Sequence, residues 1–221
     1  MDLNPWLTIT TATLTTRAMR ERAGQIASAL QIDESEIAAR LEPAIQARSL
    51  AEWLQVTGID YSAGRELNAI DYPSATFAGV FSSNVLEHVT PAALAAIHRE
   101  TLRLLSDDGV AVHRINPEDH FKEVDPNITG ANFLQYSSAE WHWYGGSGLA
   151  YHNRLRCCQH LKALEDAGLQ ILHARTRPDP EARRAIETGA LRVHPEFSGM
   201  DAVELTDDYV WVAARKQGTG A

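Results

Sequence analysis

Apolar residues recur at helical spacing through the first third of the chain. Between residues 17 and 30 they return every three to five positions, which predicts an amphipathic helix. Asp33 with Glu36, and Ser49 with Glu52, have the spacing of helix-capping pairs, so each pair predicts the start of a further helix. The N-terminal third is therefore predicted to be helical.

From residue 77 onward the pattern changes to short apolar runs. Residues 77–81 predict a strand that is buried on both faces. Thr90 followed by Pro91 predicts the start of a helix, which the polar turn at 107–109 ends before a second strand at 110–115. A strand, a helix and a strand in this order predict a parallel sheet with right-handed crossovers, and so an α/β fold.

The last part of the chain follows a long loop. Residues 116–153 form a loop or insertion after a strand end, where loops of this length are usually functional. Ser137 and Glu140 are spaced as a capping pair, which predicts a short helix through Trp141. Later elements are a helix from Arg154 to Ala167 stopped by Gly168, a strand at 169–172, a last helix from Asp179-Pro180 to near Gly189, and a strand at 209–214. The two strands predict a hairpin-like finish to the sheet.

Composition narrows the class of protein without identifying it. The chain has 221 residues, 44% of them hydrophobic, which predicts one domain over residues 1–216 and a disordered tail at 217–221. The net charge of −9 disfavours a nucleic-acid partner, which usually needs a basic face. No apolar run approaches the roughly 18 residues of a membrane span, and the first residues lack a signal-peptide pattern. The adjacent cysteines Cys157 and Cys158 suit a reducing cytoplasm.

Two segments carry a resemblance to a known family. Ser82-Ser83-Asn84-Val85-Leu86-Glu87-His88-Val89 follows a predicted strand, and Leu104-Leu105-Ser106-Asp107-Asp108-Gly109 precedes the next one. Together they resemble class I S-adenosylmethionine-dependent methyltransferases, and the stretches at 115–121 and 151–156 look like a bacterial subgroup of these enzymes. The resemblance implies a Rossmann-like methyltransferase sheet with helices on both faces.

This resemblance leaves the family's opening elements unaccounted for. Residues 1–6 look like the end of the family's second strand, so we expect the chain to lack the first strand and the glycine-rich loop. Residues 145–148 hold the densest glycine cluster, but they follow no predicted strand and suit a flexible turn. Two unpaired strand edges would result, which is an aggregation hazard. The sequence therefore predicts either a truncated chain or another way of filling the gap.

The resemblance implies a set of residues that bind S-adenosylmethionine. An acidic residue at the second strand's end would accept hydrogen bonds from the ribose hydroxyls, which points to Asp2 with Asn4 beside it. An acidic residue after the third strand would accept from the adenine amino group; Asp60 is favoured over Asp71 for this position. Three residues would pass under the methionine part of the cofactor, where ligands also bind by the switch-point rule: Ser82, Ser83 and Asn84.

The same side of the sheet carries the candidates for chemistry. His120, with Asp119 before it, follows the second predicted strand and is the candidate base for a substrate hydroxyl or amine; the alternative is a histidine that fixes the loop. Glu87 and His88 match two positions of a Glu-x-x-Glu-His metal arrangement found in a minority of relatives. Asn84 stands at its first position, so we expect no metal there and assign Glu87 and His88 to the substrate side.

Aromatic and basic residues complete the predicted substrate side. Trp141, Trp143 and Tyr144 either wall a pocket or form a small satellite core. Tyr151 and Arg154 are further candidates, with Arg154 holding either an anionic substrate group or a local partner such as Asp125.

The predicted function is methyl transfer from S-adenosylmethionine to an oxygen or nitrogen of a small-molecule or glycan-type acceptor. The alternative is a degenerate, methyltransferase-like binding module without catalysis. A metal-assisted hydrolase ranks third, because the nine histidines show no paired ligand spacing such as His-x-x-x-His.

Overall fold

The computed structural model describes residues 7–63, 71–145 and 151–217. Asp2, Asn4, residues 146–148 of the glycine cluster and most of the predicted tail lie outside the described residues. The sequence predicted one domain over residues 1–216, whereas the chain divides into two compact units, Met1–Ile70 and Asp71–Ala221. None of the described helices is long and apolar enough to cross a membrane.

The first unit is helical, as its pattern predicts. Its helices are α1 (Ile9–Glu21), α2 (Ala23–Leu30), α3 (Glu34–Gln46) and α4 (Leu50–Thr57). The helix predicted over residues 17–30 is in fact two, because the chain turns at Arg22 between α1 and α2. Both predicted caps are confirmed: Asp33 accepts a hydrogen bond from the amide of Ser35, and Ser49 accepts one from Glu52. A small core of Ala23, Ala27 and Ile37 joins α2 and α3.

The second unit is built on a mixed sheet of four described strands. They are β1 (Phe77–Ser83), β2 (Leu105–Ile115), β3 (Leu169–Pro178) and β4 (Asp207–Lys216), in the order β1-β2-β4-β3. β1 and β2 are parallel, with α5 (Pro91–Leu104) between them in the chain, which confirms the predicted strand-helix-strand unit. β4 runs antiparallel to both of its neighbours, so the hairpin-like finish is confirmed.

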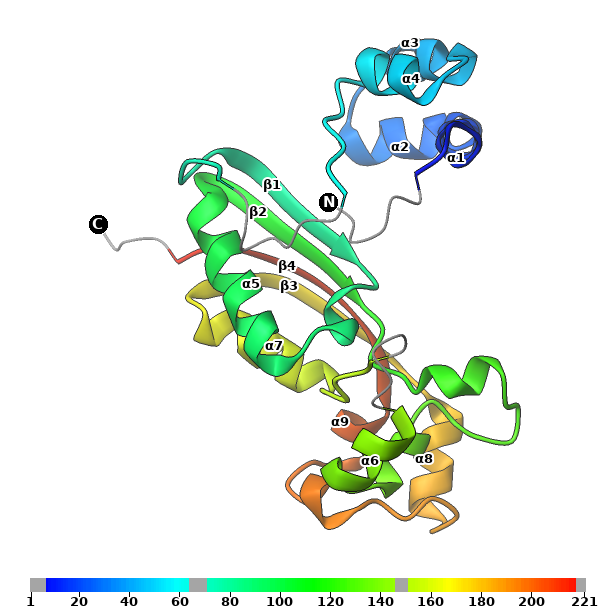
Figure 1. Ribbon diagram of the computed structural model, residues 1–221, viewed down its shortest axis with the longest axis vertical. Coiled ribbons are helices and arrows are strands. Elements are labelled where there is room, and N and C mark those ends of the chain that lie inside the picture. The colour runs from blue at the N-terminus through cyan, green and yellow to red at the C-terminus, as the bar shows by residue number, and fades with distance from the viewer. Residues whose placement is uncertain (1–6, 64–70, 146–150, 218–221) are drawn as a thin grey trace. The chain divides into compact units, whose positions relative to one another are not determined.

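Within this unit, helices cover one face of the sheet instead of the two predicted (Figure 1). α5 and α7 (Cys157–Asp166) pack on this face. Leu94 of α5 and Leu164 of α7 form a core there with Ile115 and Val210 of the sheet. On the opposite face Phe81 is 85% exposed and Val112 is 49% exposed. The prediction that β1 is buried on both faces is therefore wrong, because alternate side chains of a strand point to opposite faces. Among the described strands, β1 is paired with β2 alone.

Several element boundaries differ from the sequence expectation, and β3 extends to Pro178 instead of residue 172. β2 begins at Leu105, directly after α5, so the turn predicted at 107–109 lies inside the strand. The register between β1 and β2 shifts near Gly109, where an added Cβ would stand 3.0 Å from the carbonyl oxygen of Phe77. α7 begins at Cys157 instead of residue 154. The last helix is α9 (Ala202–Thr206) instead of α8 (Pro180–Glu187), and its five residues are too few for a periodic pattern.

A second small core lies beyond the strand ends. It is formed by α6 (Ser138–Gly145), α8, α9 and the short 3-10 helices η4 (Asn132–Gln135) and η5 (Pro195–Phe197). Its buried side chains are Ala131, Phe133, Leu134, Trp141, Ala182, Phe197 and Leu205. The described residues 116–145 of the segment predicted as a long loop thus share an apolar core with residues 182–205.

Replacing Gly168 with alanine is expected to lower the free energy of unfolding by about 1–2 kcal/mol. Gly168 follows α7 with φ of 92°, a conformation that a Cβ disfavours, although space is available because the nearest atom, on Leu102, is 3.4 Å away. Gly199→Ala is the matched control, since its φ lies outside the left-handed region and an added Cβ meets nothing within 4 Å. Urea unfolding of both variants measures the difference. Equal losses would contradict the conformational explanation.

Candidate functional site

The predicted cofactor residues at the end of β1 are held by the protein itself. The Ser82 hydroxyl lies 2.8 Å from Nδ1 of His113, and the Asn84 amide donates to the Tyr209 hydroxyl at 3.4 Å. Asn84 takes a left-handed φ of 53°, which turns the chain sharply as it leaves β1. Ser83 between them is exposed. Asn84 is exposed as well, so Ser83 differs from it in making no side-chain hydrogen bond to the described residues.

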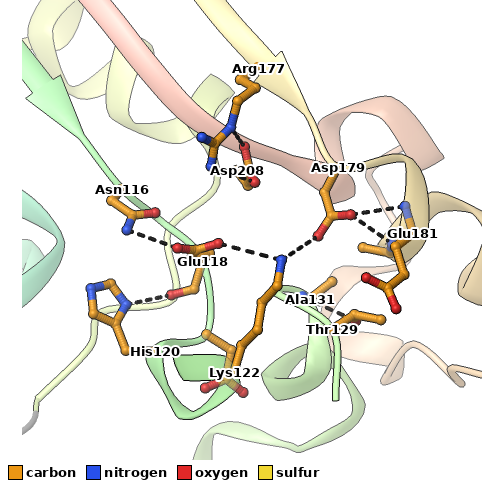
Figure 2. Close-up of polar contacts among 12 residues, drawn as sticks. Asn116, Glu118, His120, Lys122, Thr129, Ala131, Arg177, Asp179, Glu181 and Asp208 are labelled. Carbon is orange, nitrogen blue, oxygen red and sulfur yellow. Dashed lines mark hydrogen bonds and ion pairs between the residues drawn. The ribbon is translucent and has the colours of Figure 1, made fainter. Parts of the chain in front are cut away.

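The loop after β2 is fixed by the ionic network in Figure 2. Asn116 donates to the Glu118 carboxylate at 3.1 Å, and Lys122 lies 3.8 Å from Glu118 and 3.4 Å from Asp179. Asp179 is buried and also caps α8, accepting from the amide of Glu181 at 2.9 Å. Because Asp179 pairs with Lys122 of the loop and also caps α8, the segment around His120 is tied to the start of α8.

Asp119, predicted as catalytic together with His120, is 1% exposed and serves as a cap. Its carboxylate accepts from the amide of Phe121 at 3.0 Å and from the Asn132 side chain at 3.2 Å. Burial raises the pKa of Asp119, and these hydrogen bonds lower it in part. Asp119 therefore fixes the conformation of the loop that carries His120.

Three histidines meet at the ends of the strands: His88, His120 and His152. One ring nitrogen from each lies within 4.8 Å of the other two. The ring centroids of His120 and His152 are 3.9 Å apart, and His88 lies 4.6 Å from His152 and 5.2 Å from His120. His88 is exposed, His120 is half-buried and His152 is 6% exposed, so the cluster opens to solvent on the His88 side. We call these three residues the histidine cluster.

Hydrogen bonds set the tautomers of two of these rings. Nδ1 of His88 lies 3.1 Å from the carbonyl oxygen of Tyr151, and Nδ1 of His120 lies 3.0 Å from that of Glu118. A carbonyl oxygen only accepts, so each Nδ1 carries the proton and each Nε2 keeps a free lone pair. Nε2 of His152 is buried with no hydrogen-bond partner among the described residues. Burial, with the neighbouring His120 and His88, lowers the pKa of His152 to about 3, so this ring is neutral at pH 7.

Asn153 brings His152 to the cluster. Its side chain donates to the carbonyl oxygens of Leu86 at 2.8 Å and Val89 at 3.0 Å, and its amide donates to that of Glu87 at 2.9 Å. These bonds fasten the segment before α7 to η2 (Leu86–His88), the turn that carries His88.

Glu87 lies beside the cluster and is buried. Its side chain is 0% exposed, and neither carboxylate oxygen has a hydrogen-bond partner among the described residues. Burial raises the pKa of Glu87, while the backbone amides of Glu87 and Asn116 and the neighbouring His88 and His120 lower it in part. A buried carboxylate without partners is costly, which calls for a positive group nearby.

Some of the predicted aromatic and basic substrate residues are buried in the protein, and others are exposed. Trp141 belongs to the second small core, in agreement with the satellite-core alternative, while Trp143 and Tyr144 are exposed. Arg154 is 9% exposed and donates to the carbonyl oxygens of Phe133 and Tyr136 and to Ser138. Its ion pair is with Glu196 at 3.7 Å instead of Asp125.

The acidic residues predicted for the adenine group are not at a strand end. Asp60 is exposed and follows α4 in the helical first unit, and Asp71 lies in an exposed segment before β1. The expectation that Asp60 follows a strand is therefore wrong. The helical pattern of residues 50–57 continues to Gly58, which takes the left-handed conformation that ends a helix.

Two hollows in the described surface lie away from the end of β1 and from the histidine cluster. One of 380 Å³ lies between α5 and α7 and is lined in part by Leu94, Arg99 and Leu155. Another of 210 Å³ adjoins Ser138, Arg154 and Glu196. Neither is lined by the β1 end or the histidine cluster.

Sequence reasoning missed His152 as a site residue. Its ring meets residues that are 32 and 64 positions away in the chain, so no local spacing marks the cluster. The available signal was indirect: three histidines each lie in a segment predicted to leave the sheet on its ligand side.

No protein-family model matches the chain, and no curated protein matches it. Solved structures of S-adenosylmethionine-dependent methyltransferases resemble it at low sequence identity. One from Mesorhizobium loti is 20% identical over 77% of this chain and 77% of its own, with a TM-score of 0.44. The geranyl diphosphate C-methyltransferase of Streptomyces coelicolor A3(2) is 13% identical over 76% of this chain and 57% of its own, with a TM-score of 0.45.

Proposed function

We propose that the chain transfers a methyl group from S-adenosylmethionine to an oxygen or nitrogen of a small-molecule or glycan-type acceptor. The observation that carries the proposal is the β1-α5-β2 unit, which holds the two family-like segments. Its turn at Ser83 and Asn84 leaves β1 at the carboxyl end of a parallel pair, where ligands of open α/β sheets bind.

The described residues fit the cofactor in part. Ser83 is exposed at the strand end, but the Ser82 and Asn84 side chains already contact His113 and Tyr209. Asp60 lies after a helix. Ser83 is therefore the described side chain that we assign to the cofactor. When bound, S-adenosylmethionine supplies an electrophilic methyl group; the protein's contribution is to position the acceptor and take up its proton.

His120 is the residue we assign to proton uptake. Its Nδ1–H is fixed on Glu118, so the free lone pair is on Nε2. His120 is half-buried and lies next to the exposed His88, which leaves an approach for an acceptor hydroxyl or amine. Asp119 acts through the loop geometry, as a positioning residue.

Calorimetric titration with S-adenosylmethionine tests the proposal. The full chain is expected to bind the cofactor, and Ser83→Tyr is expected to weaken binding at least tenfold because the larger side chain obstructs the strand end. Ser198→Tyr, at another exposed serine, is the matched control and should bind like the parent.

No binding by a folded, monodisperse sample would sink the enzyme proposal. That result would support the second candidate, a binding module without catalysis. The observation that favours this candidate is the internal hydrogen bonding of Ser82 and Asn84.

A further inference from the structure

We propose that His88, His120 and His152 bind a divalent transition-metal ion of the zinc type, with a coordination position left open toward solvent. This inference goes beyond methyl transfer and does not depend on it. It rests on the convergence of three imidazoles from three separate segments, with one ring nitrogen from each within 4.8 Å of the others.

The distances need only a small adjustment. Ligand nitrogens about 2.1 Å from a tetrahedral zinc ion lie about 3.4 Å apart. The cluster must therefore contract by up to about 1.4 Å, which the exposed His88 side chain can do by rotation. The hydrogen bonds on Nδ1 of His88 and His120 leave Nε2 of both rings available.

The surroundings match those of metal-bound histidines. Such rings usually donate their second N–H to a carbonyl oxygen or carboxylate, which orients them. The carbonyl oxygens of Tyr151 and Glu118 provide this for His88 and His120. The unpartnered, fully buried carboxylate of Glu87 provides negative charge that a dication nearby would balance.

The ligand chemistry selects the metal. Imidazole nitrogen suits Zn²⁺, Co²⁺, Ni²⁺ and Cu²⁺, whereas Mg²⁺ and Ca²⁺ prefer oxygen. Three protein ligands leave the fourth position of a tetrahedral ion for water or an oxygen of a substrate, as in catalytic zinc sites. His120 cannot accept a proton while its Nε2 binds a metal. In the metal-bound protein the ion would lower the pKa of an acceptor hydroxyl bound to it, and that hydroxyl would release its proton to solvent on the open His88 side.

Metal titration of the chelator-treated full chain is the test. One equivalent of Co²⁺ should give the intense visible absorption of a tetrahedral site, and Zn²⁺ should displace it. We expect His88→Ala and His120→Ala each to weaken Zn²⁺ binding by at least about 100-fold, and Glu87→Gln by about tenfold, the scale on which outer-shell partners act.

Two controls make the result decisive. His173→Ala, at an exposed histidine on β3, should bind zinc like the parent chain. Mg²⁺ should not compete with Co²⁺. His88 is exposed, so its alanine variant should keep the circular dichroism spectrum and urea midpoint of the parent. Absence of one-to-one binding, or equal losses in the His88 and His173 variants, would overturn the metal site and leave the assignment of His120 as a base. Neither readout requires S-adenosylmethionine, so failure of the proposed function would be seen separately.

Discussion

The free energy of unfolding is expected to fall by several kcal/mol between pH 7 and pH 5. Three histidines are buried between the sheet and its helices: His98 on α5, His113 on β2 and His160 on α7. Burial lowers the pKa of His98 and His113 to about 4 and that of His160 to about 3. Their rings are therefore neutral in the folded chain above about pH 5.

The sign of the effect follows from proton linkage. The unfolded chain protonates its histidines near pH 6.5, whereas the folded chain does so only near pH 3 to 4. Between these values the unfolded state binds more protons, so stability is complete above about pH 6.5 and is lost as the pH falls. Each such histidine contributes about 2 kcal/mol between pH 7 and 5, which is large against a typical total of about 5–15 kcal/mol. The lowered pKa of the buried His152 adds to this effect, whereas the raised pKa values of Glu87 and Asp119 act in the opposite direction.

Urea unfolding at half-unit steps from pH 5 to 8 measures this slope. His160→Gln removes one titrating group and should flatten the curve by about 1 kcal/mol per pH unit, whatever it does to stability at pH 7.5. His173→Gln, at an exposed position, should leave the slope unchanged. A slope that is the same in both variants would show that the buried rings do not cause the acid sensitivity.

Local sequence signals predicted the helices and strands better than they predicted which side chains are buried. The caps at Asp33, Ser49, Thr90 and Asp179, and the stop at Gly168, are confirmed because each depends on a few neighbouring residues. The exposed face of β1 could not be predicted from its apolar run, since Phe81 and Val80 are equally apolar but point to opposite faces. Burial is a property of what packs against a strand.

The candidate site likewise combines residues that the sequence identifies with one that it does not. His88 and His120 were found because they follow predicted strands. Their meeting with His152 depends on Asn153, whose side chain joins two segments over 60 residues apart. Sequence spacing carries no trace of such a contact. The division of the chain near residue 70 was missed as well, since helical pattern alone does not tell which helices pack with the sheet.

Replacing Arg156 with methionine is expected to cost about 3 kcal/mol or more of unfolding free energy. The Arg156 side chain is 1% exposed, and its guanidinium donates to the carbonyl oxygens of Pro117 and Asp207 and lies 5.2 Å from the Phe133 ring. It therefore joins the end of β2, the start of β4 and the second small core. Methionine fills much of the volume but leaves two buried carbonyl oxygens without their donors.

Two further variants separate this role from general sensitivity to substitution. Arg156→Lys should recover only part of the loss, because a single ammonium group cannot reproduce the planar fork that reaches both carbonyl oxygens. Arg192→Met, at an exposed position, should change stability by less than about 0.5 kcal/mol. Urea unfolding at pH 7.5 keeps the buried histidines neutral during the comparison. If Arg156→Met and Arg192→Met lose the same stability, the buried guanidinium does not hold these three parts together. If Arg156→Met is destabilised and Arg192→Met is not, unfolding of Arg156→Met by acid and by urea should both shift from that of the parent chain. The reason is that the segment fixed by Arg156 carries His160 one turn further along α7.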